Sequence, residues 1–163
     1  MDISEFFLPE SVIAQKKISS KKRALEQLSE LLVFASPELT QAEVFEGLIG
    51  RERLGSTGLG HGAAIPHGRL KGVEKPVCAF LQLQQGVDFD AVDNQSVDLI
   101  CALLVPEEST SEHLALLSML AEIFGDEAFC EQLRAADDDA SLYQLLTQWQ
   151  SSLGSTQQAR PCA

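Results

Sequence analysis

Residues 97–105 read V-D-L-I-C-A-L-L-V, a run in which only Asp98 is polar. The run is short, follows Asn94 closely and stops at Pro106, so its length and its borders are typical of a β-strand. A strand that faced water on one side would alternate apolar and polar residues, whereas this one is apolar at nearly every position. It therefore predicts an interior strand with both faces covered, which favours a sheet with helices on either side.

A second apolar run and several amphipathic stretches surround this strand in the sequence. Residues 77–83, V-C-A-F-L-Q-L, predict another interior strand. Elsewhere apolar side chains recur at three- and four-residue spacing, which is the pattern of helices that pack on one side. This spacing, with candidate capping boxes at Thr40–Glu43 and Ser109–Glu112, predicts helices over residues 21–34, from Thr40 to Arg51–Arg53, from Ser109 to Phe124, over 126–135 and over 141–149.

The composition indicates one globular domain. The chain has 163 residues, of which 45% are hydrophobic and 22% are charged, and a chain of this length can bury a substantial core. Residues 1–150 are expected to form the domain. Residues 151–163 lack periodicity, which predicts a flexible C-terminal tail.

The charge and the cysteine pattern exclude several function classes. The net charge is −12, which argues against a surface for nucleic acid. The basic cluster at residues 16–23 is more typical of the solvated start of a helix than of a nucleic-acid or membrane patch. No run approaches the roughly 18 apolar residues of a membrane span, and the first residues lack the features of a signal peptide. The four cysteines form no C-x-x-C pair, which suits a reducing compartment. We therefore expect a cytoplasmic protein without nucleic-acid binding or membrane insertion.

Residues 55–70, G-S-T-G-L-G-H-G-A-A-I-P-H-G-R-L, gather five glycines and two histidines. Glycine weakens regular elements, so such a cluster indicates unusual backbone angles or the close approach of another group. The run lacks the spacing of a P-loop or a dinucleotide fingerprint. His61 and His67, with His113 and Glu112, match no standard metal-ligand spacing. We expect no metal and no cofactor, while a purely structural connector stays open at this point.

A further interpretation is a histidine that accepts a phosphoryl group. A neutral imidazole is nucleophilic near pH 7 because its ordinary pKa is about 6.5. Pro66 restricts the backbone immediately before His67, and Gly68 lets the chain turn away after it. This arrangement predicts a ring that is presented at the surface.

Donors for a phosphoryl group lie close to this histidine in the sequence. The hydroxyls of Ser56 and Thr57 and the N–H groups of a glycine-rich backbone can donate hydrogen bonds to phosphoryl oxygens. Arg51 can add a guanidinium. An arginine at a helix C-terminus can also merely offset the helix dipole, so its role stays open on these grounds.

The residues themselves resemble a known family. Residues 51–70, R-E-R-L-G-S-T-G-L-G-H-G-A-A-I-P-H-G-R-L, are similar to the phosphoryl-accepting segment of IIA proteins of the bacterial phosphoenolpyruvate phosphotransferase system, in the fructose/mannitol superfamily. Within that superfamily the chain looks most like the stand-alone nitrogen-regulatory IIA proteins (PtsN type). The similarity covers about residues 1–150 and includes residues 21–30, 89–106, 113–121 and 142–146.

The resemblance implies roles for particular residues. His67 matches the phosphorylated histidine, which reacts through Nε2, and His113 matches a second histidine that stabilises the phosphoryl group. Arg51 matches the arginine at the same distance before the acceptor. Ser56 and Thr57 fall in the G-S-T-G element that helps to form the pocket.

The resemblance also implies a fold and a function. Family members form one α/β domain with three layers, α/β/α, in which a small mixed sheet is flanked by helices. The implied function is that of a phosphocarrier and regulator, which receives a phosphoryl group from an HPr-like carrier and signals to target proteins. A sugar-specific IIA protein that passes phosphate to a IIB domain, or a binding module independent of phosphorylation, is the alternative. Relatives usually carry another polar residue at the position of His61, so no catalytic role is expected for it.

Overall fold

Strands β5 (Val77–Val87) and β6 (Val97–Pro106) form the antiparallel centre of the sheet, with Phe80 opposite Cys101. They contain both predicted interior strands. The structure is a computed structural model and describes residues 3–108 and 110–149. The predicted tail, residues 151–163, and Ser109, the first residue of the second predicted capping box, lie outside the described residues.

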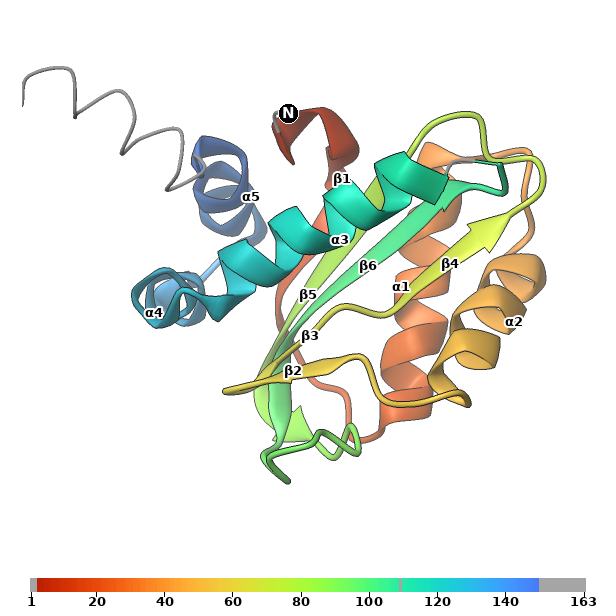
Figure 1. Cartoon of the computed structure of the whole chain (residues 1–163). Helices are drawn as coiled ribbons and strands as arrows, with labels where there is room; N and C mark the ends of the chain where they lie inside the picture. Colours follow the sequence, from red (N-terminus) through yellow and green to blue (C-terminus); the bar gives the residue numbers. More distant parts are fainter. Residues whose placement is uncertain (1–2, 109, 150–163) are drawn as a thin grey trace, which may run out of the picture.

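Four further strands complete the sheet (Figure 1). β1 (Phe7–Lys16) runs parallel to β5 at one edge. On the other side β3 (Ala63–Ala64) and β4 (His67–Leu70) both run parallel to β6, and β2 (Gly58–Gly60) pairs antiparallel with β3. The six-stranded sheet of the described residues is therefore mixed, as predicted.

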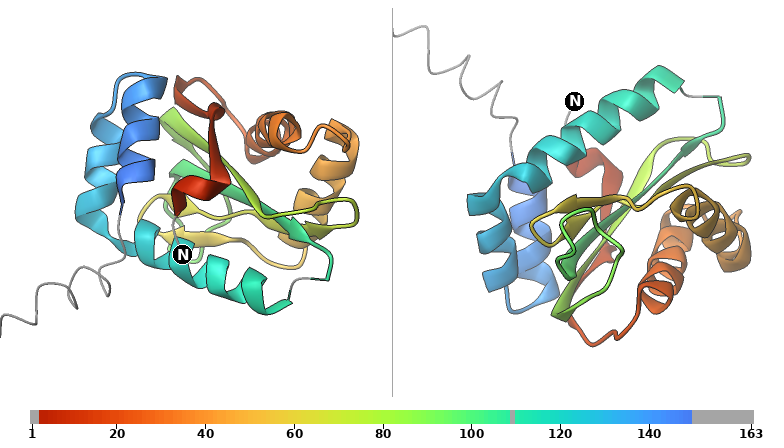
Figure 2. Two further views of the ribbon diagram at one scale, coloured as in Figure 1. Left: turned by 90° about the horizontal axis from the view of Figure 1, so that it is seen from above. Right: turned by 60° about the horizontal axis from the view of Figure 1, so that its bottom comes forward.

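Helices cover both faces of the sheet, which Figure 2 shows from two directions. The side chains of Ile100, Ala102 and Leu104 in β6 pack in the core on the α1 and α2 side, whereas Cys101, Leu103 and Val105 pack in the core on the side of α3, α4 and α5. This alternation confirms the three-layer α/β/α prediction. The helices are η1 (Ile3–Phe6), α1 (Lys21–Ala35), α2 (Gln41–Glu52), α3 (Thr110–Gly125), α4 (Glu127–Ala135) and α5 (Asp139–Gln148).

Side-chain caps fix where several helices begin. The predicted capping box of α2 is confirmed, because the Glu43 N–H donates to the Thr40 hydroxyl at 3.2 Å and the Thr40 N–H donates to the Glu43 carboxylate at 3.0 Å. Such a pair satisfies backbone donors that have no partner within the helix. In the described part of the chain, no helix has the length and the apolar composition that a bilayer span requires.

Four strands were not predicted from the sequence. β1 contains Pro9 and has register shifts against β5, so its polar and apolar residues do not alternate regularly. β2, β3 and β4 lie in the glycine-rich stretch 55–70, for which the sequence pattern predicts no regular element. They are two to four residues long, so their hydrogen bonds to β6 and to each other, rather than a local pattern, define them.

Candidate functional site

Strand β4 places His67 between two helices. His67 pairs in parallel with Leu103, whose side chain packs on the α3 side, and Gly68 pairs with Leu104, which packs on the α2 side. Paired residues of neighbouring strands point to the same face, so the His67 ring lies on the α3 side. A Cβ at Gly68 would lie 3.4 Å from the backbone of Gly47 in α2, so the absence of a side chain lets α2 approach β4 closely.

The His67 ring is held in one orientation and is largely enclosed. Its Nδ1 lies 2.9 Å from the Ile65 carbonyl oxygen, which can only accept, so Nδ1 carries the proton and Nε2 keeps its lone pair. His67 is only 9% exposed. The prediction of a ring presented at the surface is therefore wrong, because pairing with the buried strand β6 draws this residue into the sheet.

Burial also keeps this ring neutral. It lowers the pKa of His67 below the ordinary value of 6.5, against the raising effect of the Ile65 hydrogen bond. The positive charge of Arg51 lowers the pKa further, and the negative charge of Glu52 partly opposes it. A neutral imidazole with a free Nε2 is the nucleophilic form of histidine.

His113 lies beside His67 in the first turn of α3. The two ring centroids are 5.2 Å apart, and the ring planes meet at 76°. The Nε2 atom of His113 is buried and has no hydrogen-bond partner among the described residues. Burial, followed by the charges of His67 and Arg69, lowers the pKa of His113. A buried polar atom without a partner indicates a position prepared for a ligand group.

Arg51 lies in the last turn of α2, and its charge acts on His67. One guanidinium N–H donates to the Gly55 carbonyl at 2.8 Å. A guanidinium has five N–H donors, so this bond orients Arg51 and leaves other donors for an anion.

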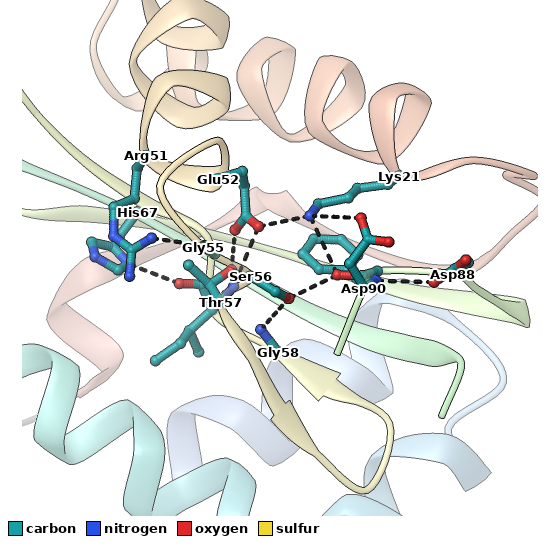
Figure 3. Close-up of polar contacts among 12 residues, drawn as sticks. Lys21, Arg51, Glu52, Gly55, Ser56, Thr57, Gly58, His67, Asp88 and Asp90 are labelled. Carbon is teal, nitrogen blue, oxygen red and sulfur yellow. Dashed lines mark hydrogen bonds and ion pairs between the residues drawn. The ribbon is translucent and has the colours of Figure 1, made fainter. Parts of the chain in front are cut away.

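Ser56 and Thr57 use their hydroxyls to hold the glycine-rich loop (Figure 3). The Thr57 hydroxyl donates to the Glu52 carboxylate, and the Thr57 N–H donates to the same carboxylate at 3.3 Å. The Ser56 hydroxyl donates to the Phe89 carbonyl at 2.7 Å and accepts from the Gly58 N–H at 3.1 Å. The structure thus brings His67, His113 and Arg51 together and gives the two hydroxyls protein partners.

Comparison with known proteins assigns this chain to a family. Residues 5–149 match the family model described as "Phosphoenolpyruvate-dependent sugar phosphotransferase system, EIIA 2". The chain belongs to this EIIA family. Its relatives include a nitrogen regulatory protein of Klebsiella oxytoca, which is 44% identical over 149 residues that cover 91% of each chain.

Solved structures support the assignment of this chain to the EIIA family. The crystal structure of nitrogen regulatory protein IIA-Ntr from Neisseria meningitidis has a TM-score of 0.83 at 43% identity, covering 89% of this chain and 99% of that one. The crystal structure of IIA mannitol from Escherichia coli, at 23% identity, has a TM-score of 0.67 and covers 90% of this chain and 98% of that one. This second structure shares the fold.

Glu52 and Lys21 of the EIIA protein lie at the site, although the sequence pattern predicts no role for them. The Glu52 side chain is 2% exposed, and its carboxylate lies 2.9 Å from the Lys21 ammonium at the start of α1. Glutamate at the end of a helix is usually solvated, so nothing local in the sequence marked this residue. The pairing depends on residues 31 positions apart, and sequence spacing gives no signal for it.

Arg69 was also missed, although a signal existed. Alternate residues of a strand point to the same side, so Arg69 follows His67 on the α3 side of β4, and its charge acts on His113. Recognising β4 as a strand would have placed this arginine near the two histidines.

His61 lies in the turn between β2 and β3, away from the histidine pair. Its backbone φ is +56°, and its Nδ1 lies 3.1 Å from the Glu127 carboxylate in α4. Its N–H donates to the Asp93 carboxylate at 2.9 Å. Within residues 3–108 and 110–149, no group of three or more His, Cys, Asp or Glu side chains is placed to hold a metal ion.

Proposed function

We propose that this protein accepts a phosphoryl group on Nε2 of His67 from the phosphohistidine of an HPr-like carrier and signals through its phosphorylation state. The observation that carries the proposal is the hydrogen bond from Nδ1 to the Ile65 carbonyl, which leaves Nε2 unprotonated beside His113. A nucleophile needs this lone pair, and no general base is required to create it.

The transfer step is a displacement at phosphorus. The Nε2 lone pair of His67 forms the new P–N bond while the P–N bond of the carrier breaks, and the carrier nitrogen leaves with that electron pair. Nδ1 of His67 keeps its proton throughout, and this N–H stays hydrogen-bonded to the Ile65 carbonyl oxygen. The protein therefore has to supply position and charge stabilisation rather than proton transfer.

His113 and Arg51 can supply that stabilisation. The buried Nε2 of His113 has no partner among the described residues and can donate a hydrogen bond to a phosphoryl oxygen on the neighbouring ring. Arg51 is a permanent cation whose field reaches His67. Donors and charges aimed at a transferring phosphoryl group are the main catalytic contribution of proteins in such reactions. We assign Ser56 and Thr57 to shaping the pocket.

The nitrogen-regulatory branch is favoured over a sugar-specific IIA protein. Two proteins named as nitrogen regulatory share 43% and 44% of their aligned residues with this chain, whereas IIA mannitol shares 23%. A phosphoryl group adds up to two negative charges, and such a change at the protein surface can select between partners. Regulatory targets would then distinguish the two states of His67.

Labelling by phosphoenolpyruvate tests the proposal. The protein is incubated with labelled phosphoenolpyruvate, enzyme I and an HPr-like carrier, and acid-labile protein phosphate is measured. We expect His67→Ala to abolish the label and His113→Ala to slow labelling by about 100–1,000-fold, the loss typical of removing one donor to a transition state. His61→Ala is the matched control and should label like the unaltered protein.

Other outcomes would support a different function. A label that survives His67→Ala and disappears in His61→Ala would contradict the site. Onward transfer to an added IIB domain at the rate of loading would favour a sugar-specific IIA protein. Partner binding that is identical for unaltered protein, with and without label, and for His67→Ala would indicate a module independent of phosphorylation.

A further inference from the structure

We propose that Lys21 is a positioning residue of the phosphoryl site, whose ammonium neutralises the buried Glu52 carboxylate and so lets Glu52 hold the loop 55–58 without opposing a phosphoryl group on His67. This inference rests on the proposed function of His67 and names residues that act on it indirectly.

Glu52 is the buried centre of the loop contacts (Figure 3). One carboxylate oxygen accepts from the Thr57 hydroxyl, and the other accepts from the Thr57 N–H at 3.3 Å and meets the Lys21 ammonium at 2.9 Å. Both oxygens are therefore occupied. Such partners offset the cost of burying a carboxylate.

Lys21 joins three parts of the chain at this point. From the first turn of α1 its ammonium contacts Glu52 in α2, donates to the Phe89 carbonyl at 3.3 Å and lies 4.6 Å from the centre of the Phe89 ring. It also lies 3.7 Å from the exposed carboxylate of Asp90. The Phe89 carbonyl accepts from the Ser56 hydroxyl as well, so Lys21 and Ser56 hold the same group.

The charge of Glu52 matters because it reaches His67. The Glu52 carboxylate raises the pKa of His67, against the lowering by burial and by Arg51. Arg51 on α2 also acts on the ring of His67, and Arg69 on β4 acts on the ring of His113 on α3. A carboxylate that attracts a proton to His67 also repels the negative charge of a phosphoryl group there. Lys21 provides the opposite charge at the carboxylate itself.

A purely mechanical role would give different mutant behaviour. If the Lys21–Glu52 pair only held the loop in place, removing either residue would impair phosphorylation. If charge compensation is the function, removing the Lys21 charge should weaken the binding of a phosphoryl group to His67, and removing the Glu52 charge should strengthen it. When both charges are removed together, the two effects should nearly cancel.

The test uses Lys21→Met, Glu52→Gln and the double variant, with Lys22→Met as the exposed neighbouring control. The first measurement is the equilibrium distribution of phosphate between His67 and the carrier. We expect Lys21→Met to lower the equilibrium constant about fivefold and Glu52→Gln to raise it about fivefold, as for one charge in a partly screened site. For the double variant and for Lys22→Met, the equilibrium constant should be close to that of the unaltered protein.

The second measurement is NMR titration of the His67 ring in the unphosphorylated protein. We expect the pKa of His67 to rise in Lys21→Met and to fall in Glu52→Gln. In the double variant it should be close to its value in the unaltered protein. This readout does not depend on any transfer reaction. If the unaltered protein takes no label, the proposed function fails, while the titration still decides whether Lys21 compensates Glu52.

The ordering of the variants decides the proposal. It is overturned if Glu52→Gln lowers the transfer equilibrium constant as Lys21→Met does, if the double variant is worse than both, or if neither measurement changes. Lys21→Met leaves a buried carboxylate unpaired and can fail to fold, whereas Glu52→Gln and the double variant bury no carboxylate at this position. In that case Glu52→Gln must still raise the transfer equilibrium constant, and the double variant must still have a constant near that of the unaltered protein.

Discussion

At the scale of single residues, the chemistry depends on which imidazole nitrogen carries the proton. The backbone carbonyl of Ile65 makes this choice for His67, so the proposed nucleophile needs no dedicated base. Burial, the repulsion that a protonated His67 would exert and the positive charge of Arg69 lower the pKa of His113 and keep this partner ring neutral. Two neutral rings in contact avoid the repulsion that two imidazolium ions would suffer.

The pH dependence of labelling follows from these shifts. The pKa of His67 and that of His113 both lie below 6.5, so both rings stay neutral as the pH falls through the ordinary histidine value. Labelling rates measured under saturating phosphorylated carrier should therefore hold from pH 8 to 6.5 and decline only below that. The same protonation should be visible as the NMR titration of the His67 ring. If the labelling rate is already halved at pH 6.5 and NMR shows half of the His67 rings protonated at that pH, the expected lowering of the pKa is wrong.

At the scale of elements, long and strongly patterned segments could be predicted from the sequence. The continuous apolar run of β6 indicated a strand covered on both faces, and the spacing of apolar residues indicated α1 to α5. The strands of the glycine-rich stretch could not be predicted, because β2, β3 and β4 exist through their pairing with each other and β6. The burial of His67 follows from that pairing and was missed for the same reason.

The candidate site was predictable to a similar degree. His67, His113 and Arg51 are identified by their resemblance to a family motif, and the structure brings them together. Glu52 and Lys21 meet in a contact between the end of α2 and the start of α1. Such contacts depend on how helices are packed, and a single sequence carries no signal for them.

Gly62 tests how the β2–β3 turn is held. Its φ is +85°, and an added Cβ would lie 2.5 Å from the guanidinium of Arg134, which donates to the His61 carbonyl at 2.8 Å. Gly62→Ala should therefore lower the free energy of unfolding by about 1–2 kcal/mol, the cost of a side chain in the left-handed region. Urea denaturation measures this change.

Gly50 provides the matched control for that substitution. It lies inside α2, and an added Cβ would meet nothing within 4 Å. Gly50→Ala should raise the free energy of unfolding by about 0.5–1 kcal/mol, because alanine loses less backbone entropy in a helix. If the two substitutions change the free energy of unfolding by the same amount and in the same direction, neither the left-handed backbone at Gly62 nor the Arg134 contact contributes to stability as expected.

At the scale of the whole molecule, the proposed phosphoryl transfer requires two proteins to bring their histidines together. Leu114 is 63% exposed and directly follows His113, and Leu59 on β2 is 37% exposed. Apolar side chains at the rim of a reactive site are suited to docking a partner. On the proposed function, we expect Leu114, with Leu59 as a second candidate, to lie in the surface that receives the carrier.

Substitution of Leu114 tests this docking surface. Leu114→Asp should raise the KM for the phosphorylated carrier about tenfold, because it places a charge in an apolar contact, and should leave the label at full occupancy unchanged. Phe34→Asp is the control, since Phe34 is 59% exposed at the far end of α1 from Lys21. A larger effect of Phe34→Asp than of Leu114→Asp would place the docking surface elsewhere.

The bond formed on His67 is the central claim, and phosphorus–nitrogen NMR tests it most directly. Protein with ¹⁵N-labelled histidine is phosphorylated through the carrier, and the ³¹P–¹⁵N coupling identifies the bonded nitrogen. The structure predicts one phosphorylated histidine, His67, coupled through Nε2, with Nδ1 still protonated. Coupling through Nδ1 of His67, or to His61 or His113 instead, would contradict the proposed mechanism.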